Sequence, residues 1–287
     1  MTDVIYTHGH HDSVLRSHRW RTAENSAGYL LGHLRPGMTL LDVGCGPGTI
    51  TCDLAERVAP APVVGIDSSE AVVTEARARA AVSGPSSVSF EVGSAFDLRF
   101  EDGSIDVVHA HQVLQHVGDP VGALAEMRRV CRPGGIVAAR DSDYPTFRWF
   151  PEDPELDRAL AAYGALTRAN GANWDAGRRL LGWAHRTGFE SVVPSASAWC
   201  FATPEDRAWW GGLWADRFTV SSLAEQLLAQ GIAGRDDLAS FADAWRRWAS
   251  SPDGWLAMLH GEVICTARRP CQATTAATNR SGASTIG

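Results

Sequence analysis

From Met38 to Asp141, short apolar runs alternate with segments of helical character. Each run holds five or six residues, which suits a buried strand, and no hairpin signal joins two successive runs. A strand that is followed by a helix and then by another strand forms a parallel pair. The alternation therefore predicts an α/β fold, with a parallel sheet covered by helices on both faces. The expected strands are 39–43, 62–66, 88–92, 105–110 and 135–140, and the expected helices are 49–58, 69–82 and 120–131.

The pattern changes beyond Asp141, where longer helical segments take over and ten of the 11 tryptophans lie. Two more strands are expected at residues 189–201 and 262–268, with helices over residues 204–249 between them. We therefore divide the chain into amino-terminal helices (1–35), a core (36–141), remaining strands with a helical cap (142–269) and a tail (270–287). The small polar residues of the tail predict disorder.

The composition argues against several classes of function. All 26 basic residues are Arg, so chemistry through a lysine Schiff base or a phosphate-loop lysine is excluded. The net charge of −7 argues against a nucleic-acid partner. No apolar stretch approaches the ~20 residues of a membrane-spanning helix, and the amino terminus does not resemble a secretory signal. We expect a cytoplasmic protein that does not insert into membranes.

No metal site is expected. The six cysteines contain no CxxC pair, and His8, His10 and His11 have no acidic or cysteine partner at ligand spacing.

The stretch LLDVGCGPGTIT at residues 40–51 places a glycine-rich loop between a strand and a helix. Glycines at positions 44, 46 and 48 allow a sharp turn and a close approach of a ligand to backbone N–H groups. A dinucleotide-binding GxGxxG motif would need glycine where Thr49 stands, so the loop disfavours a nicotinamide cofactor. About twenty residues on, Asp67 ends the second expected strand, where a carboxylate can accept both ribose hydroxyls of a nucleoside. The alternative is that Asp67 caps the helix that begins near Ser69.

Three further stretches carry a resemblance to a known family: GIDSS at 65–69, VGSAFDLRFEDGSIDVVHAHQVLQHV at 92–117 and RRVCRPGGIVAARD at 128–141. Together with the glycine loop they resemble class I S-adenosylmethionine-dependent methyltransferases, most of all the branch of ubiquinone and menaquinone C-methyltransferases and actinobacterial small-molecule enzymes. The resemblance covers roughly Leu30 to Asp141. It implies a Rossmann-like sheet of seven strands whose last strand is antiparallel, and S-adenosylmethionine as the cofactor.

The resemblance also implies roles for individual residues around the cofactor. Ser94 stands where most relatives carry an acid, and Asp97 is a candidate to replace it. An amino-terminal lid over the methionine carboxylate would use Tyr6, His11, Arg16 or Arg21. The expected cofactor-binding residues are Asp42, Gly44, Cys45, Gly46, Asp67, Ser68, Ser94, Ala95, Phe96, His111 and Gln112.

Methyl transfer depends mainly on alignment of donor and acceptor, and a base adds to it where the acceptor must lose a proton. The candidates for that base are His116, His111 and Asp141, at or just after the ends of the fourth and fifth strands. The alternatives are that His116 holds the loop before residue 120 and that Asp141 orders its own loop.

The insertions at residues 142–175 and 203–260 are expected to cover the acceptor, and their aromatic side chains suit a flat, hydrophobic or prenylated molecule. The alternative is that most of these tryptophans form a core. The expected substrate-binding residues are Tyr144, Trp174, Arg178, Trp209, Trp210 and Trp214.

The leading hypothesis is therefore a methyltransferase that acts on a carbon or oxygen of a small acceptor, in quinone-like or specialised metabolism. A peptide or other macromolecule methyltransferase and an inactive module that only binds the cofactor are the alternatives. A homodimer is one assembly that the sequence leaves open.

Overall fold

The structure, a computed structural model, describes residues 17–267. The expected tail at 270–287, the histidines at 8, 10 and 11, and the lid candidates Tyr6 and Arg16 lie outside the described residues.

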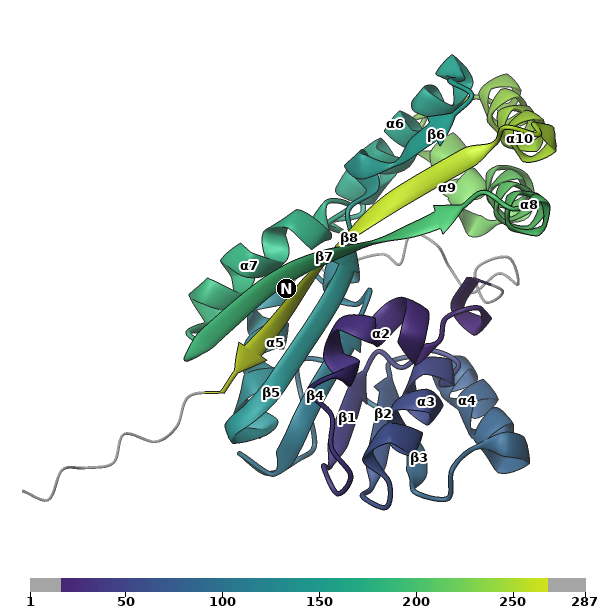
Figure 1. Cartoon of the computed structure of the whole chain (residues 1–287). Helices are drawn as coiled ribbons and strands as arrows, with labels where there is room; N and C mark the ends of the chain where they lie inside the picture. Colours follow the sequence, from purple (N-terminus) through teal and green to yellow (C-terminus); the bar gives the residue numbers. More distant parts are fainter. Residues whose placement is uncertain (1–16, 268–287) are drawn as a thin grey trace, which may run out of the picture.

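The central sheet has the predicted doubly wound arrangement (Figure 1). Its strand order is β3-β2-β1-β4-β5-β8-β6, and β7 pairs with β8. The first five strands are parallel, and β8 runs antiparallel to β5, β6 and β7, as expected for the last strand. The strands are β1 (Leu40–Val43), β2 (Val63–Asp67), β3 (Val88–Val92), β4 (Ile105–His111), β5 (Cys131–Ser142), β6 (Arg148–Phe150), β7 (Ser191–Phe201) and β8 (Trp255–Thr266).

Helices cover both faces of the sheet because alternate residues of each strand point to opposite sides. On one face, α2 (Ala23–Leu31) and α3 (Thr49–Val58) bury Leu30 and Leu54 against strand residues such as Val107. On the other face, α5 (Pro120–Val130) and α7 (Ala176–Thr187) pack in a separate cluster with Val108. The helix α4 (Glu70–Ser83) contacts β2 and β3 at the sheet edge.

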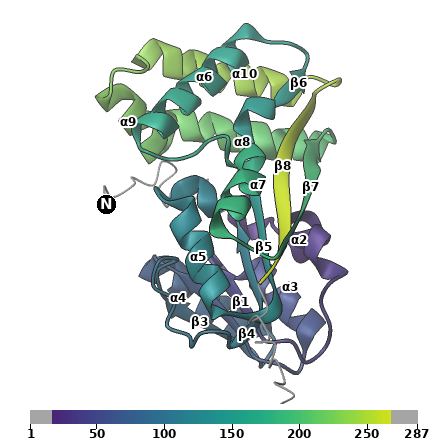
Figure 2. The ribbon, with the colours of Figure 1, turned by 90° about the vertical axis from the view of Figure 1, so that its left-hand side faces the viewer.

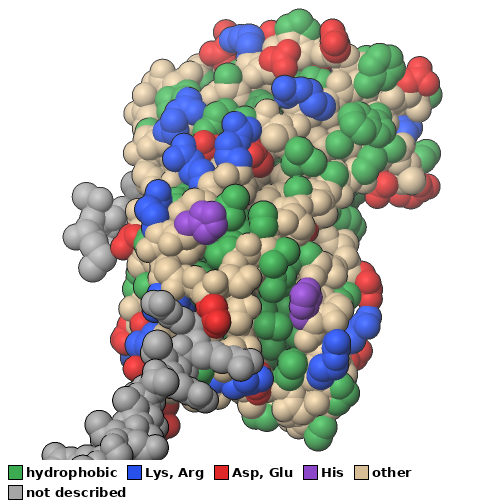
Figure 3. All heavy atoms as spheres, turned by 60° about the vertical axis from the view of Figure 1, so that its left-hand side comes forward, with side chains coloured by type: hydrophobic (Ala, Val, Ile, Leu, Met, Phe, Trp, Pro, Cys, Tyr) green, Lys and Arg blue, Asp and Glu red, His purple; other side chains and the backbone are tan. Residues whose placement is uncertain are grey.

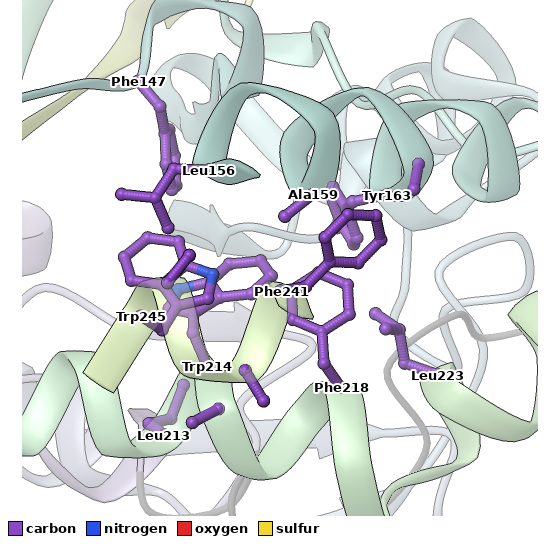
Figure 4. Close-up of a cluster of buried hydrophobic side chains, with 14 of the residues drawn as sticks. Phe147, Leu156, Ala159, Tyr163, Leu213, Trp214, Phe218, Leu223, Phe241 and Trp245 are labelled. Atoms are coloured by element: carbon purple, nitrogen blue, oxygen red, sulfur yellow. The ribbon is translucent and has the colours of Figure 1, made fainter. Parts of the chain in front are cut away.

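The cap is a second body of helices at the far ends of β7 and β8, which both extend beyond the parallel strands (Figures 1 and 2). It consists of α6 (Pro154–Ala169), α8 (Pro204–Val220), α9 (Ser222–Ala229) and α10 (Arg235–Ser250). The cap has its own aromatic core, in which the rings of Trp214 and Trp245 stack with centroids 5.5 Å apart (Figure 4).

Several details differ from the sequence expectations, among them the start of β5 at Cys131 rather than at residue 135. The last strand begins at Trp255 rather than at residue 262, because its first half pairs with β6 and β7 beside the cap. The short strand β6 was not expected. The helical region at 204–249 is broken twice, at Ser221 and in the segment before Gly234.

The surface drawn in Figure 3 carries arginines and acidic side chains interspersed with apolar and uncharged groups. Among residues 17–267, no helix combines the length and the hydropathy that a membrane crossing requires.

Candidate functional site

A cavity of about 340 Å³ lies at the carboxyl ends of β1, β2 and β4. This edge is where open α/β sheets bind their ligands, because the loops after the strands diverge there. The cavity is lined by the glycine loop, the ends of β2 and β4 and the loop after β3, and by Arg21, Tyr144 and Arg217 from outside the core. All eleven residues expected to surround the cofactor line this one cavity.

The glycine loop is shaped by three residues with positive φ, namely 69° at Gly44, 56° at Gly46 and 79° at Gly48. At Gly44, a Cβ atom would lie 2.3 Å from Cγ2 of Val113, so the loop packs directly on the segment after β4. At Gly46, a Cβ atom would meet nothing within 4 Å. The loop therefore leaves open space above the Gly46 backbone, which a ligand can approach closely.

Asp67 ties the glycine loop to the end of β2. Its Oδ2 accepts a hydrogen bond from the N–H of Gly46 at 3.1 Å, and its Oδ1 accepts one from the N–H of Ser69 at 3.0 Å. Ser69 itself is the N-cap of α4, and its side chain accepts from Val72. Asp67 is half-buried and lines the cavity, and each carboxylate oxygen has a second acceptor position for a ligand hydroxyl.

Asp42 lies below the loop with both carboxylate oxygens engaged. Oδ1 is 2.8 Å from Nδ1 of His109, and Oδ2 accepts from Oγ1 of Thr51 at 2.6 Å. Both Asp42 and His109 are buried. The pair anchors β1 to β4 directly under the cavity, and sequence reasoning did not single out His109.

The loop after β3 provides the far end of the cavity through Ser94, Ala95 and Phe96. The hydroxyl of Ser94 accepts from the N–H of Phe96 at 3.2 Å, and the Phe96 ring is 42% exposed. Asp97, the candidate to replace the acid of the relatives, is exposed and does not line the cavity.

His111 and His116 both face the cavity and are held in the neutral form. Burial, with the positive charges of Arg21 and Arg140, lowers the pKa of His111 well below its usual value. Burial and Arg21 lower the pKa of His116 to about 3. Both ring nitrogens of His111 are buried and have no hydrogen-bond partner within the described chain.

Asp141 lies behind the cavity wall and not on it. Its Oδ1 accepts from the N–H of Gln115 at 3.1 Å, while its Oδ2 is buried with no hydrogen bond from the described residues. Burial raises the pKa of this carboxyl to about 7. Asp141 thus orders the turn that carries Gln115 and His116.

Gln112 connects the parts that surround the cavity. It adopts a positive φ of 55°, which is uncommon for a residue other than glycine. Its backbone N–H donates to the carbonyl of Arg140 at 2.7 Å, and its Oε1 accepts from Nη2 of Arg21 at 2.6 Å. Its Nε2 lies 2.9 Å from Nε2 of His260 on β8. Gln112 therefore couples the amino-terminal segment to the sheet strand that reaches the cap.

Of the six expected substrate-binding residues, Tyr144 lines the cavity and the other five do not. Trp210 and Trp214 lie in the cap core, and Trp209 packs against Phe201 at 5.9 Å between ring centroids. Trp174 packs so closely on α6 that a Cβ atom at Gly164 would lie 2.4 Å from its ring. Arg178 is exposed and forms two hydrogen bonds with Asp143, at 2.7 and 2.8 Å.

Arg217 is a cavity residue that the sequence reasoning missed. It projects from α8, is only 4% exposed, and holds its guanidinium 4.8 Å from the ring centroid of Trp214. Helical spacing from Trp210 and Trp214 predicts that position 217 is buried, but it does not predict that Arg217 reaches the cavity.

The arrangement is a single cavity, which the glycine loop and the strand ends line together with Arg21, Tyr144 and Arg217. The described residues contain no cluster of His, Cys, Asp and Glu that could hold a metal ion.

Comparison with known proteins gives a consistent result. Residues 34–187 match the model of a family described as "Methyltransferase domain". An uncharacterized methyltransferase of Schizosaccharomyces pombe is 33% identical over 91% of this chain and 96% of its own length. A demethylmenaquinone methyltransferase of Lactococcus lactis is 36% identical over 42% of this chain and 48% of its own length. The structure of Haemonchus contortus phosphoethanolamine N-methyltransferase 2, solved in complex with S-adenosyl-L-methionine, superimposes with a TM-score of 0.54 at 16% identity, covering 93% of this chain and 55% of that one.

Proposed function

The chain belongs to the class I S-adenosylmethionine-dependent methyltransferases, and we propose that it methylates a carbon or oxygen of a small aromatic or prenylated acceptor in quinone-like or specialised metabolism. S-adenosylmethionine is the cofactor of this enzyme class, and it supplies a methyl group activated by a positively charged sulfur. The acceptor and the roles of individual residues are part of the proposal.

The described residues fit this cofactor. Asp67 offers two carboxylate oxygens at the strand end where the ribose of a nucleoside is held. The open space above Gly46 would admit the amino-acid portion against backbone N–H groups, and Arg21, which lines the same cavity, would pair with its carboxylate. Ser94, Ala95 and Phe96 form a wall suited to the adenine ring. The observation that supports the proposal most is the hydrogen bond from the N–H of Gly46 to Asp67. This bond joins the glycine loop to the carboxylate that we expect to bind the ribose.

The residues beyond the cofactor end would position the acceptor and exclude water. His111, Gln112 and Tyr144 lie on the cavity wall and are all largely buried. Holding donor and acceptor in attack geometry contributes ~7 to 11 kcal/mol to methyl transfer without any covalent intermediate on the protein. Tyr144 belongs to the segment that leads from β5 into the cap.

The similarity to demethylmenaquinone methyltransferases supports a flat aromatic ring as acceptor.

The test is methyl transfer from labelled S-adenosylmethionine to a panel of naphthols, hydroxyquinones and simple phenols, followed by mass spectrometry. We expect a singly methylated product from at least one bicyclic aromatic member. Transfer to a peptide library with no product from any small aromatic compound would contradict the proposed acceptor class.

A further inference from the structure

The turn after β4 carries two neighbouring residues that line the cavity, Gln115 and His116. Nε2 of the Gln115 side chain lies 2.9 Å from Nε2 of the His116 ring. A hydrogen bond between two nitrogens needs one donor and one acceptor, and each nitrogen of an imidazole can be either. The direction of this bond therefore decides which nitrogen of His116 carries the proton.

The orientation of the Gln115 amide settles that direction. The backbone N–H of Ser142 donates to Oε1 of Gln115 at 3.3 Å. A backbone N–H can only donate, so the atom of the amide that faces Ser142 is the oxygen. The group that faces His116 is then the amide NH2, which donates and does not accept. Nε2 of His116 is thus the acceptor, and the proton of the neutral ring lies on Nδ1.

The turn that presents Gln115 is held from two sides. Its backbone N–H donates to Oδ1 of Asp141 at 3.1 Å, and its carbonyl accepts from the N–H of Asn173 at 2.7 Å. Nδ2 of Asn173 also donates to the carbonyl of Val117 at 3.0 Å. Gln115 and Ser142 are both buried. A reversed amide would place its NH2 against the N–H of Ser142, where one donor would face another without water to satisfy them.

A second glutamine on the cavity wall repeats this arrangement. Oε1 of Gln112 accepts from Nη2 of Arg21 at 2.6 Å, and its Nε2 lies 2.9 Å from Nε2 of His260. An arginine side chain offers donors and no acceptor, so it fixes the Gln112 amide as Ser142 fixes that of Gln115. His260 therefore also accepts at Nε2, and it serves as an internal comparison for His116.

The charge on the His116 ring follows from its surroundings. Burial and the positive charge of Arg21 lower the pKa of His116. A donor at Nε2 acts in the same direction, because a hydrogen bond to the neutral form disfavours the charged form. A neutral ring also suits a cavity that receives a sulfonium, since an imidazolium would repel that positive charge.

We propose that Gln115 is a positioning residue that holds His116 as a neutral imidazole with its proton on Nδ1, and that His116 is part of the cavity wall and not the base of methyl transfer. The nitrogen that could take a proton from an acceptor is occupied by the Gln115 amide. The statement about the base rests on the proposed function, whereas the tautomer is a property of the folded chain.

Nuclear magnetic resonance of the full chain with ¹⁵N-labelled histidine tests the tautomer. Long-range ¹H–¹⁵N correlations distinguish a protonated ring nitrogen from a bare one, and His116→Gln assigns the signals of His116 by their absence. We expect a protonated Nδ1 and a bare Nε2, with no titration of this ring between about pH 8 and about pH 5.5. A proton on Nε2, or an ordinary titration near pH 6.5, would overturn the proposal.

Gln115→Glu tests whether Gln115 sets this state. The variant replaces the donor by a carboxylate, which accepts from the ring and favours the imidazolium. The pKa of His116 should rise from about 3 to above about 6.5, so that Nε2 carries a proton at neutral pH. An unchanged His116 spectrum in this variant would remove Gln115 from the account. The wild-type spectrum alone decides the tautomer, so the test holds if the variant does not fold.

The matched control is Gln230→Glu. Gln230 is exposed, lies outside the cavity wall, and donates its amide hydrogen bond to Oδ1 of Asn170 at 3.1 Å. The control therefore removes the same kind of donor and adds the same charge away from His116. It should leave the signals of His116 and His260 unchanged.

Kinetics test the statement about the base. With an acceptor found in the panel of aromatic compounds, His116→Gln should lower kcat by less than about 10-fold, whereas loss of a general base costs about 100- to 10,000-fold. A loss of that size would show that His116 takes the proton. Failure of S-adenosylhomocysteine to bind in calorimetry would overturn the proposed function, and resonance spectra of the chain without ligand would still decide the tautomer.

Discussion

Asp67 has a structural role in the glycine loop, and we propose that it also binds the cofactor ribose. Its carboxylate holds the N–H groups of Gly46 and Ser69, so the glycine loop and the start of α4 share one anchor. The sequence predicted this residue from its place after a buried strand. The N-cap position of α4, the alternative role for Asp67, is occupied by Ser69.

Replacing Asp67 by Ala should raise the Kd for S-adenosylhomocysteine by about 10- to 100-fold. The reason is that the variant loses hydrogen bonds to a charged acceptor, each of which contributes about 1.5 to 3 kcal/mol. Isothermal titration calorimetry measures the change, and Glu91→Gln on the exposed face of β3 is the control carboxylate. Equal affinities for Asp67→Ala and the wild type would show that the ribose lies elsewhere.

Other residues could not be found from the sequence because their environment depends on distant segments. His109 gains its role from Asp42, which lies 67 positions earlier in the chain. Arg217 is one of 26 arginines, and its place in the cavity wall follows from how α8 packs on the aromatic cap. The tryptophans expected to contact the substrate lie away from the cavity for the same reason. Helical spacing predicts which face of a helix is buried, but not which part of the molecule that face contacts.

At the scale of elements, the parallel core was predictable because each strand is a short apolar run between glycine and helix signals. The boundaries of β1, β2 and β3 differ from the expected ones by one residue or less at each end. The segment 255–261 was missed as strand because it follows long helices and contains residues that suit either state. The three residues of β6 are too few to show a period.

Two neighbouring glycines of α8 allow a test of how closely α8 packs against α10. At Gly211 a Cβ atom would lie 2.7 Å from Cβ of Ala249 and 2.8 Å from the carbonyl oxygen of Trp245, whereas at Gly212 it would meet nothing within 4 Å. Gly211→Ala should therefore lower the free energy of unfolding by about 1 to 3 kcal/mol through overpacking. Gly212→Ala should raise it by about 0.5 to 1 kcal/mol, as alanine does in an open helical position.

Urea unfolding of the two variants checks this pair. The helix contact would be refuted if Gly211→Ala were as stable as Gly212→Ala.

At the scale of the whole molecule, the protein buries neutral histidines along the line where the core meets the cap. Burial and nearby arginines lower the pKa values of His111, His116 and His260, on β4, the turn after it and β8. Asp141 has the opposite shift, with its pKa raised to about 7 by burial. These groups link folding to pH, and their contributions have opposite signs.

Stability should fall as the pH is lowered from 7 to 5. In that range the unfolded chain protonates the three histidines, whose ordinary pKa is about 6.5, while the folded chain does not. Asp141 opposes this, because the folded chain binds its proton below pH 7 and the unfolded chain does so only near pH 4. The net uptake of about two protons on unfolding near pH 5 corresponds to roughly 2 to 3 kcal/mol per pH unit.

His116→Gln isolates one of these protons, since glutamine keeps a polar group opposite the Gln115 side chain, which lies 2.9 Å from Nε2 of His116. Urea unfolding at pH 5, 6 and 7 should show a slope smaller by about 1 kcal/mol per pH unit in the variant. An unchanged slope would mean that His116 titrates normally in the folded protein.

The most direct test of the account is a crystal structure of the chain with S-adenosylhomocysteine bound. We predict that the ribose hydroxyls donate to the Asp67 carboxylate, that the adenine lies beside Phe96, and that the sulfur faces the part of the cavity wall that holds His111. A nucleoside bound with its ribose away from Asp67, or with its sulfur turned away from His111, would contradict the account.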